Sequence, residues 1–370
     1  IAIGQSALAA SVDDGTCNIA IGMTAMGGAD TSGDDNIAIG TNAADALLAG
    51  TGNIAMGRHT LGGMTAGLCN VAIGFGAMTD ISTGSANHNV AIGTGALVGS
   101  GTTSGSDNIA IGREAGNDLT SGVENVFVGL GSGGNSTTGC RNIALGSNTL
   151  GGAITTGNNN IALGFNAMDA LTSGACNIAL GLNALGAATD NCDNIAIGRS
   201  ALAASVNDAD FNIAIGCGAM GGADVSGLNN IAMGTAAGDA LTSGACNIAL
   251  GINALGAATD NCDNIAIGQA ALAASVNDGD FNIAIGCQAM GGSDVASLNN
   301  IAIGTAAAVG FLIAVTGTIT MITGGKIIDN VNTPFSLGYI NLLGFIVFVP
   351  VTMIMARLGA KAVYKIDKKI

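Results

Sequence analysis

The chain has few of the residues on which most binding and catalytic sites depend. Its 370 residues include no Trp, two Tyr, two Pro and two His, and only 9% are charged. Residues 1–304 contain no Lys and hold 23 Asp and Glu against four Arg. An acidic surface without stacking aromatic rings disfavours binding of nucleic acid and of flat sugar rings.

Glycine and small apolar residues are abundant instead. There are 61 Gly, and 49% of the chain is hydrophobic. Glycine does not recur at every third position, which excludes a collagen helix, and the apolar content disfavours disorder. Residues 305–370 reverse the charge balance, with two acidic and six basic residues. We therefore predict two domains, 1–304 and 305–370.

A short motif recurs throughout the first domain. Asn-[Ile/Val]-Ala-[Ile/Leu/Met/Val]-Gly returns every 17 to 19 residues, and 18 copies end between Gly4 and Gly304. Phe127 replaces the central Ala in one copy only. Residues 168–237 also match 238–307 almost residue for residue, a longer period of 70 that spans four copies.

The alternation in each copy predicts a strand followed by a corner. In Asn18-Ile19-Ala20-Ile21-Gly22 the two Ile share one face, which we expect to be buried, and Ala20 points the other way. Ala25-Met26 predicts a second short strand. One copy cannot bury its own apolar face, so the copies should stack. We predict an all-β repeat fold, a β-solenoid or β-roll of about 18 coils.

The Asn and Gly columns are the residues that this architecture singles out. The Asn should form a ladder of side-chain amides from coil to coil, and the Gly should provide positive φ at the corners. The representative positions are Asn18, Asn36, Asn53, Asn70, Asn177, Asn194, Asn212, Asn247, Asn264, Gly22, Gly40, Gly181 and Gly198. We expect them to be structural.

The iterated Asn-Ile-Ala-Ile-Gly-x-x-Ala-Leu unit resembles the head repeats of trimeric autotransporter adhesins and the related arrays of phage tail fibres. This resemblance covers residues 1–304. It implies a solenoid that acts as a spacer or attachment surface, with self-association as a homotrimer or a host or cell-surface receptor as the partner. A coiled-coil stalk and a C-terminal barrel domain, which such adhesins carry, have no counterpart in this sequence.

The second domain predicts an α-helical membrane hairpin within residues 306–356. Two stretches, 306–324 and 335–356, carry no charge and are long enough to span a bilayer. The basic cluster after them should stay cytoplasmic. Two spans return the chain to its starting side, so this rule places the repeats in the cytoplasm, whereas the adhesin resemblance places them at the cell surface.

The same segment is similar to the C-terminal end of the sulfite exporter TauE/SafE permeases. The words that carry the resemblance are "GTAAAVGFLIAVTGTI" at 304–319 and "FSLGYINLLGFIVFVPVTMIMARLGAK" at 335–361. They cover about two helices of a larger family, so the alternative function is a truncated permease that is not competent for transport. The segment "IGTAA" at 303–307 fits both the repeat and the permease sequence, which favours a chimera of the two.

Other candidate sites are weak. The sequence contains no C-x-x-C pair, so a zinc site is not expected. The nine Cys are expected to be free and buried. Cys176/Cys192 and Cys246/Cys262 nevertheless fall on adjacent coils and could approach disulfide distance. His59 and His88 are expected at the surface. The Gly129–Gly134 stretch matches a dinucleotide-loop pattern without a following helix. Acidic loops at 189–193, 207–211 and 277–281 are expected to be solvated rather than to hold Ca²⁺.

These observations predict a structural or adhesive repeat protein, with no enzymatic activity and no cofactor.

Overall fold

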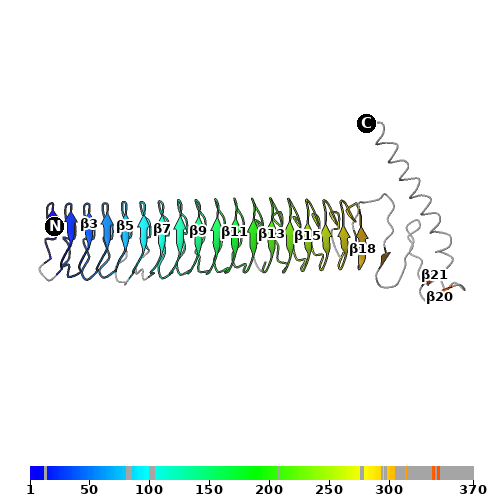
Figure 1. The fold of residues 1–370 in the computed structure, drawn as a ribbon, viewed down its shortest axis with the longest axis horizontal. Helices are drawn as coiled ribbons and strands as arrows, with labels where there is room; N and C mark the ends of the chain where they lie inside the picture. The colour runs from blue at the N-terminus through cyan, green and yellow to red at the C-terminus, as the bar shows by residue number, and fades with distance from the viewer. Residues whose placement is uncertain are drawn as a thin grey trace, which may run out of the picture.

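The computed structural model describes residues 1–304 except 12–14, 81–85, 100–104, 207–208, 276–278, 293–294 and 296–297, together with three short strands beyond residue 304. The described part of residues 1–304 is a parallel β-solenoid with one strand in each coil, and the coils stack in sequence order along a single axis (Figure 1). The strands are β1 (Ala2–Ile3), β2 (Ile19–Ile21), β3 (Ile37–Ile39), β4 (Ile54–Met56), β5 (Val71–Ile73), β6 (Val90–Ile92), β7 (Ile109–Ile111), β8 (Val126–Val128), β9 (Ile143–Leu145), β10 (Ile161–Leu163), β11 (Ile178–Leu180), β12 (Ile195–Ile197), β13 (Ile213–Ile215), β14 (Ile231–Met233), β15 (Ile248–Leu250), β16 (Ile265–Ile267), β17 (Ile283–Ile285) and β18 (Asn300–Ile303).

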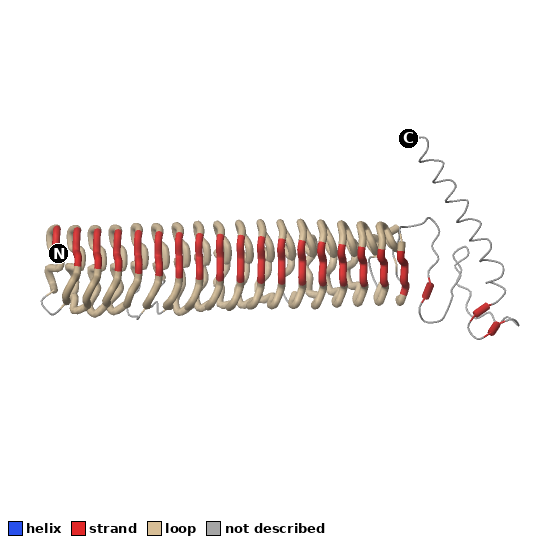
Figure 2. The backbone as a smooth tube through the Cα atoms, viewed as in Figure 1, coloured by secondary structure: helices blue, strands red, loops and turns tan. Residues whose placement is uncertain are grey.

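The strands pair in strict register, each with the next one along the chain. Ile19, Ala20 and Ile21 lie opposite Ile37, Ala38 and Ile39, and the same correspondence holds from β1 to β18. The short red strands of Figure 2 therefore form one continuous sheet along one side of the molecule. At ~4.8 Å per step the sheet is roughly 80 Å long. The predicted solenoid fold is confirmed.

The prediction of the inward face is wrong. The central Ala of each strand is the buried residue, with Ala20, Ala38 and Ala162 fully enclosed, while the flanking Ile and Val are only half-buried or exposed. Strand alternation places the central Ala on the same side as the preceding Asn, whose amide must be inside to stack. The coil is narrow, so a small residue faces the interior and the large ones face out.

The rest of the interior is filled by the turn that faces the strand across the coil, which we call the opposite wall. In the turn after the corner Gly, two consecutive residues are buried in the coils of β2 to β16, as Ala25 and Met26 are in the second coil. A strand would point neighbouring residues to opposite faces, so the predicted second strand at Ala25-Met26 is wrong. Instead the backbone φ angle alternates in sign along this turn, with positive values at Thr24 (55°) and Met26 (48°). Leu61, Met78, Leu150 and their equivalents occupy the same position and complete the core.

Phe127 is accommodated by glycine on the opposite wall. The ring is fully buried at the position that Ala occupies in the other strands. The turn position that holds Leu or Met in most coils is Gly116 in one coil and Gly133 in the next. A Cβ atom at Gly133 would lie 2.5 Å from Phe127 Cδ1, and one at Gly116 would lie 3.0 Å from Cδ2. The large residue on one wall thus requires the absence of a side chain on the other.

The remaining described strands follow the solenoid. Strand β19 (Ile313–Ala314) pairs antiparallel with β18, and β20 (Ser336–Leu337) pairs with β21 (Ile340–Asn341). The predicted hairpin over 306–356 otherwise lies outside the described residues. In the described part of the chain, no helix has the length and apolar character needed to cross a bilayer.

Candidate interaction surface

The Asn ladder lies inside the solenoid. Asn53 represents the pattern: its N–H and its Nδ2 both donate to Asn36 Oδ1 at 3.0 Å, and Nδ2 also donates to Gly67 O at 2.7 Å. All the predicted positions are buried, namely Asn18, Asn36, Asn53, Asn70, Asn177, Asn194, Asn212, Asn247 and Asn264. Each Oδ1 therefore fixes the start of the next strand, and the amide donors satisfy carbonyls that the turn would leave buried and unpaired.

The corner glycines leave no room for a side chain. Gly22, Gly40, Gly181 and Gly198 have φ between 130° and 139°. A Cβ on Gly22 would lie 2.5 Å from Gly40 O in the next coil, and one on Gly181 would lie 2.5 Å from Gly198 O. Both the backbone conformation and the coil-to-coil spacing thus demand glycine.

The Asn and Gly columns hold the coils together, and the other face of the sheet points outward. The first and third residues of each strand form an apolar strip of Ile, Val, Leu and Met that contains no charged or polar side chain from β2 to β17. Ile109 and Ile111 are 37% and 38% exposed, and Met233 is 43% exposed. The strip runs the length of the rod. Its area is on the order of 1,000 Å², which is the product of a length of roughly 80 Å and the width of two columns of side chains. Soluble monomers rarely expose an apolar patch larger than a few hundred Å².

The two long edges of the apolar strip are mostly uncharged, and the charged residues that they do contain differ in sign from one edge to the other. We call the residue after each corner Gly the basic rim, because it includes the exposed Arg58, Arg113 and Arg199. We call the residue before each ladder Asn the acidic rim. Its acidic members are Asp35, Asp107, Glu124, Asp193 and Asp263, Arg141 is its one Arg, and Cys, Asn, Phe, Gly and His hold the other places. Arg113 and Asp107 belong to the coil of β7, and Arg199 and Asp193 belong to that of β12.

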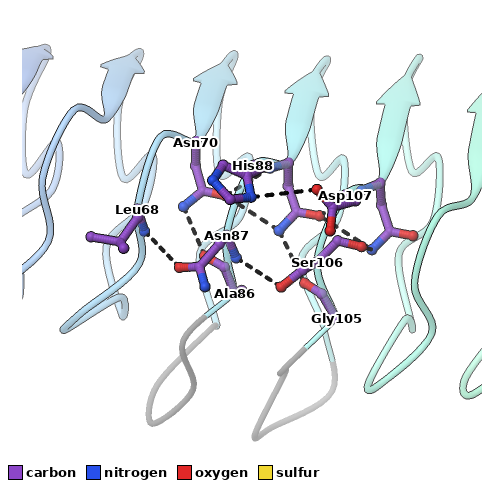
Figure 3. Close-up of polar contacts among 10 residues, drawn as sticks. Leu68, Asn70, Ala86, Asn87, His88, Gly105, Ser106 and Asp107 are labelled. Atoms are coloured by element: carbon purple, nitrogen blue, oxygen red, sulfur yellow. Dashed lines mark hydrogen bonds and ion pairs between the residues drawn. The ribbon is translucent and has the colours of Figure 1, made fainter.

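The acidic rim is held in place by polar contacts between coils (Figure 3). His88 Nδ1 lies 3.4 Å from Asp107 Oδ1, with both side chains more than half exposed. Beside them, Asn87 Oδ1 accepts the Leu68 N–H at 2.9 Å, and Ser106 Oγ accepts the Asn87 N–H at 3.1 Å. An exposed pair of this kind contributes little to stability. The contacts position the rim rather than hold the fold together.

The cysteine thiols lie on the surface rather than in the core. All nine are free, as expected, but none is buried, so the prediction of buried thiols is wrong. Four of them, Cys17, Cys69, Cys176 and Cys246, lie in the acidic rim itself. The residue beside an inward-facing Asn points outward, and the sequence pattern contained that information.

The remaining candidates lie on the outside of the coils. His88 is exposed and His59 half-exposed, as expected for both. His59 lines a hollow of about 320 Å³ with Phe75 and Asp80, and Arg58 stacks over the Phe75 ring at 4.7 Å. The Gly129–Gly134 stretch forms the turn after β8. Within the described ranges, no group of three or more His, Cys, Asp and Glu is arranged to hold a metal ion.

Neither the protein-family models nor the curated proteins contain a match to this chain.

Proposed function

We propose that this chain is a structural repeat protein whose solenoid acts as a rigid spacer or attachment surface. The observation that carries the proposal is the unbroken in-register pairing from β1 to β18, with a buried Asn amide at every step. Each coil contacts only its neighbours, so length is gained by adding coils without redesigning a core. The predicted dimension is a rod roughly 80 Å long for residues 1–304.

The apolar strip further supports self-association, with a second copy of this chain as the occupant. A stable interface buries about 800 Å² on each partner, and the strip is of that size. The adhesin resemblance favours three copies around a common axis. Such an arrangement would bury Ile109, Ile111 and the equivalent residues of every coil, which a monomer leaves in water.

The charged rims favour a parallel, in-register arrangement. When copies related by a cyclic axis along the rod pack by their strips, the basic rim of one faces the acidic rim of the next. Arg113 then faces the neighbouring copy's Asp107, and Arg199 faces Asp193, at the same height along the rod. An antiparallel pair would bring each rim against its own kind, and like charges in contact are unfavourable.

The experiment is to measure mass and shape of the purified full chain in mild detergent by analytical ultracentrifugation and negative-stain microscopy. We expect a straight rod of the predicted length that contains more than one copy. The pair Ile109→Lys/Ile111→Lys should yield monomers with unchanged circular dichroism, because these side chains point outward. A compact particle would refute the rod, and a monomeric wild type at micromolar concentration would refute only the self-association.

A charge-swap series tests the arrangement of the copies. Arg113→Glu should weaken the assembly, and the added change Asp107→Arg should restore it, because the two residues lie on opposite rims of one coil. Restoration by the double variant is not expected for antiparallel copies. A double variant as weak as the sum of the single changes would contradict the parallel arrangement.

We also propose that residues 306–356 associate the chain with a membrane, on the basis of two uncharged stretches of spanning length. The full chain should pellet with membranes, whereas a chain ending at Gly304 should stay in the supernatant. Tags at both ends, probed with protease in sealed vesicles, should be protected or cleaved together. A truncated chain that still pellets would disprove this role for the tail.

A further inference from the structure

We propose that two pairs of surface thiols, Cys176 with Cys192 and Cys246 with Cys262, are oxidation sites at which a disulfide joins adjacent coils. This inference does not depend on the proposed function of the rod. It concerns a covalent modification that would fasten the coils of β11 to β12 and of β15 to β16.

The backbone places the two members of each pair one coil and one residue apart. The Asp193 N–H donates to Ala175 O at 3.0 Å, which sets Ala175 beside Cys192 and Cys176 beside Asp193 across the coil boundary. The Ala175 N–H also donates to Cys192 Sγ at 3.4 Å. Neighbours one residue and one coil apart have Cα atoms about 6 Å apart, given ~4.8 Å between coils and 3.8 Å along the chain. That separation lies within the range of ordinary disulfides.

The second pair repeats the first one. The Asp263 N–H donates to Ala245 O at 2.9 Å, and the Ala245 N–H donates to Cys262 Sγ at 3.4 Å. Cys262 is held as Cys192 is: its N–H donates to Asp280 Oδ1 at 2.7 Å, as that of Cys192 does to Asp210 Oδ1. The same contacts recur because residues 168–237 and 238–307 are near-identical copies.

The two thiols of a pair differ in their surroundings, which gives the reaction an order. Cys176 is exposed, whereas Cys192 is half-buried. Burial raises the pKa of the Cys192 thiol, and although the Ala175 N–H lowers it, the nearby Asp210, Asp193 and Cys176 add to the rise. The thiolate is the reacting form, so Cys176 is the thiol that meets an external oxidant first.

A low-molecular-weight disulfide such as oxidised glutathione supplies the oxidising equivalents. The Cys176 thiolate attacks one glutathione sulfur, forms a mixed disulfide and releases one glutathione thiolate. The Cys192 thiolate then attacks Cys176 Sγ, which closes the protein disulfide and releases the second glutathione. Two protein thiols are oxidised and one oxidised glutathione is reduced to two molecules of glutathione.

The test is to incubate the folded full chain with oxidised glutathione and count free thiols after denaturation. Nine thiols should fall to five, with a loss of four hydrogens in the intact mass. Cleavage before Asp separates the members of each pair, because Asp190 and Asp260 lie between them. The two expected cross-linked peptides have equal mass, so the Cys176→Ser variant, which should retain six thiols, identifies which is which.

A matched variant tests whether coil geometry controls the reaction. Cys140 occupies the place of Cys192 in its own coil, and the Arg141 N–H donates to Val123 O at 2.9 Å, so Glu124 stands where Cys176 does. Glu124→Cys should therefore create a third disulfide and leave four free thiols of ten. Nine thiols after oxidation, stable glutathione adducts at Cys176 and Cys246, or random pairing among all the cysteines would each overturn the proposal.

Discussion

The fit between Phe127 and Gly133 can be tested by exchanging the large residue between the two walls. Phe127→Ala restores the residue found at the centre of the other strands but removes a fully buried ring. Because Gly133 offers no side chain to fill the space, we expect a cavity and a loss of about 3–5 kcal/mol. Gly133→Leu introduces one of the two residues, Leu and Met, that occupy most other turns, but its Cβ alone would lie 2.5 Å from Phe127 Cδ1. Overpacking should cost about 1–3 kcal/mol or more.

The double variant Phe127→Ala/Gly133→Leu should recover most of both losses. It recreates the wall pairing of an ordinary coil, such as that of Ala144 with Leu150. The positive φ of Gly133 (60°) is no obstacle, because Leu150 adopts 51° at the equivalent position. A coupling energy of at least about 2 kcal/mol is expected, at the upper end of the range for residues in contact.

Native-state hydrogen exchange is the suitable assay, because a stack of coils need not unfold in a single step. The reporter is the Val126 N–H, which donates to Asn142 O at 2.8 Å. Gly238→Leu is the matched control, since a Cβ there meets only Met220 Cγ at 3.2 Å and Ala232 Cβ at 3.7 Å. It should be tolerated better than Gly133→Leu. Additive losses in the double variant would refute the size-exchange argument.

Three further predictions follow from the burial pattern. Ala214→Asp, on the inward face, should cost several kcal/mol in unfolding free energy, whereas the neighbouring outward change Ile213→Asp should cost about 1 kcal/mol. Equal losses in urea titration would contradict the assigned faces. Asn177→Ala removes the acceptor of the Asn194 N–H and should cost roughly 2–4 kcal/mol, whereas the exposed Asn183→Ala should cost under about 1 kcal/mol, as thermal denaturation can show. Burial raises the pKa of Asp169 above its ordinary value, so its contribution to stability is present at low pH and is lost as pH rises through the folded pKa. Asp169→Asn should therefore stabilise the protein at pH 7 but not at pH 3, and a gain that is the same at both pH values would contradict this assignment.

The coil period and the direction of stacking could be predicted because they depend on local chemistry alone. A Gly that recurs every 17 to 19 residues fixes one corner in each coil, and a three-residue alternation such as Ile19-Ala20-Ile21 allows one short strand. In-register stacking then follows because like residues must lie above like residues.

The direction of the strand faces was predicted wrongly because hydrophobicity was given more weight than size. Ile19 is more apolar than Ala20, but the amide of Asn18 shares a face with Ala20 and forms hydrogen bonds inside the coil. A requirement that the ladder be buried would have given the correct face. The turn at Ala25-Met26 could not be derived in the same way, since positive φ at Met26 is uncommon for that residue type and is set by the coil.

The same constraints show where this chain can vary without losing its fold. Inside the coil, the ladder needs Asn, the strand centre needs Ala unless the opposite wall gives way, and the corner needs Gly. The two rims have no such requirement: the residue before the ladder Asn is Cys17, Asp35, Gly52, Cys69 and His88 in five successive coils. Because a rim side chain contacts only its neighbours in the adjacent coils, it can change without affecting the core. The pairs Arg113/Asp107 and Arg199/Asp193 and six of the nine cysteines lie on these rims, where a substitution changes the surface of the rod while leaving the fold intact.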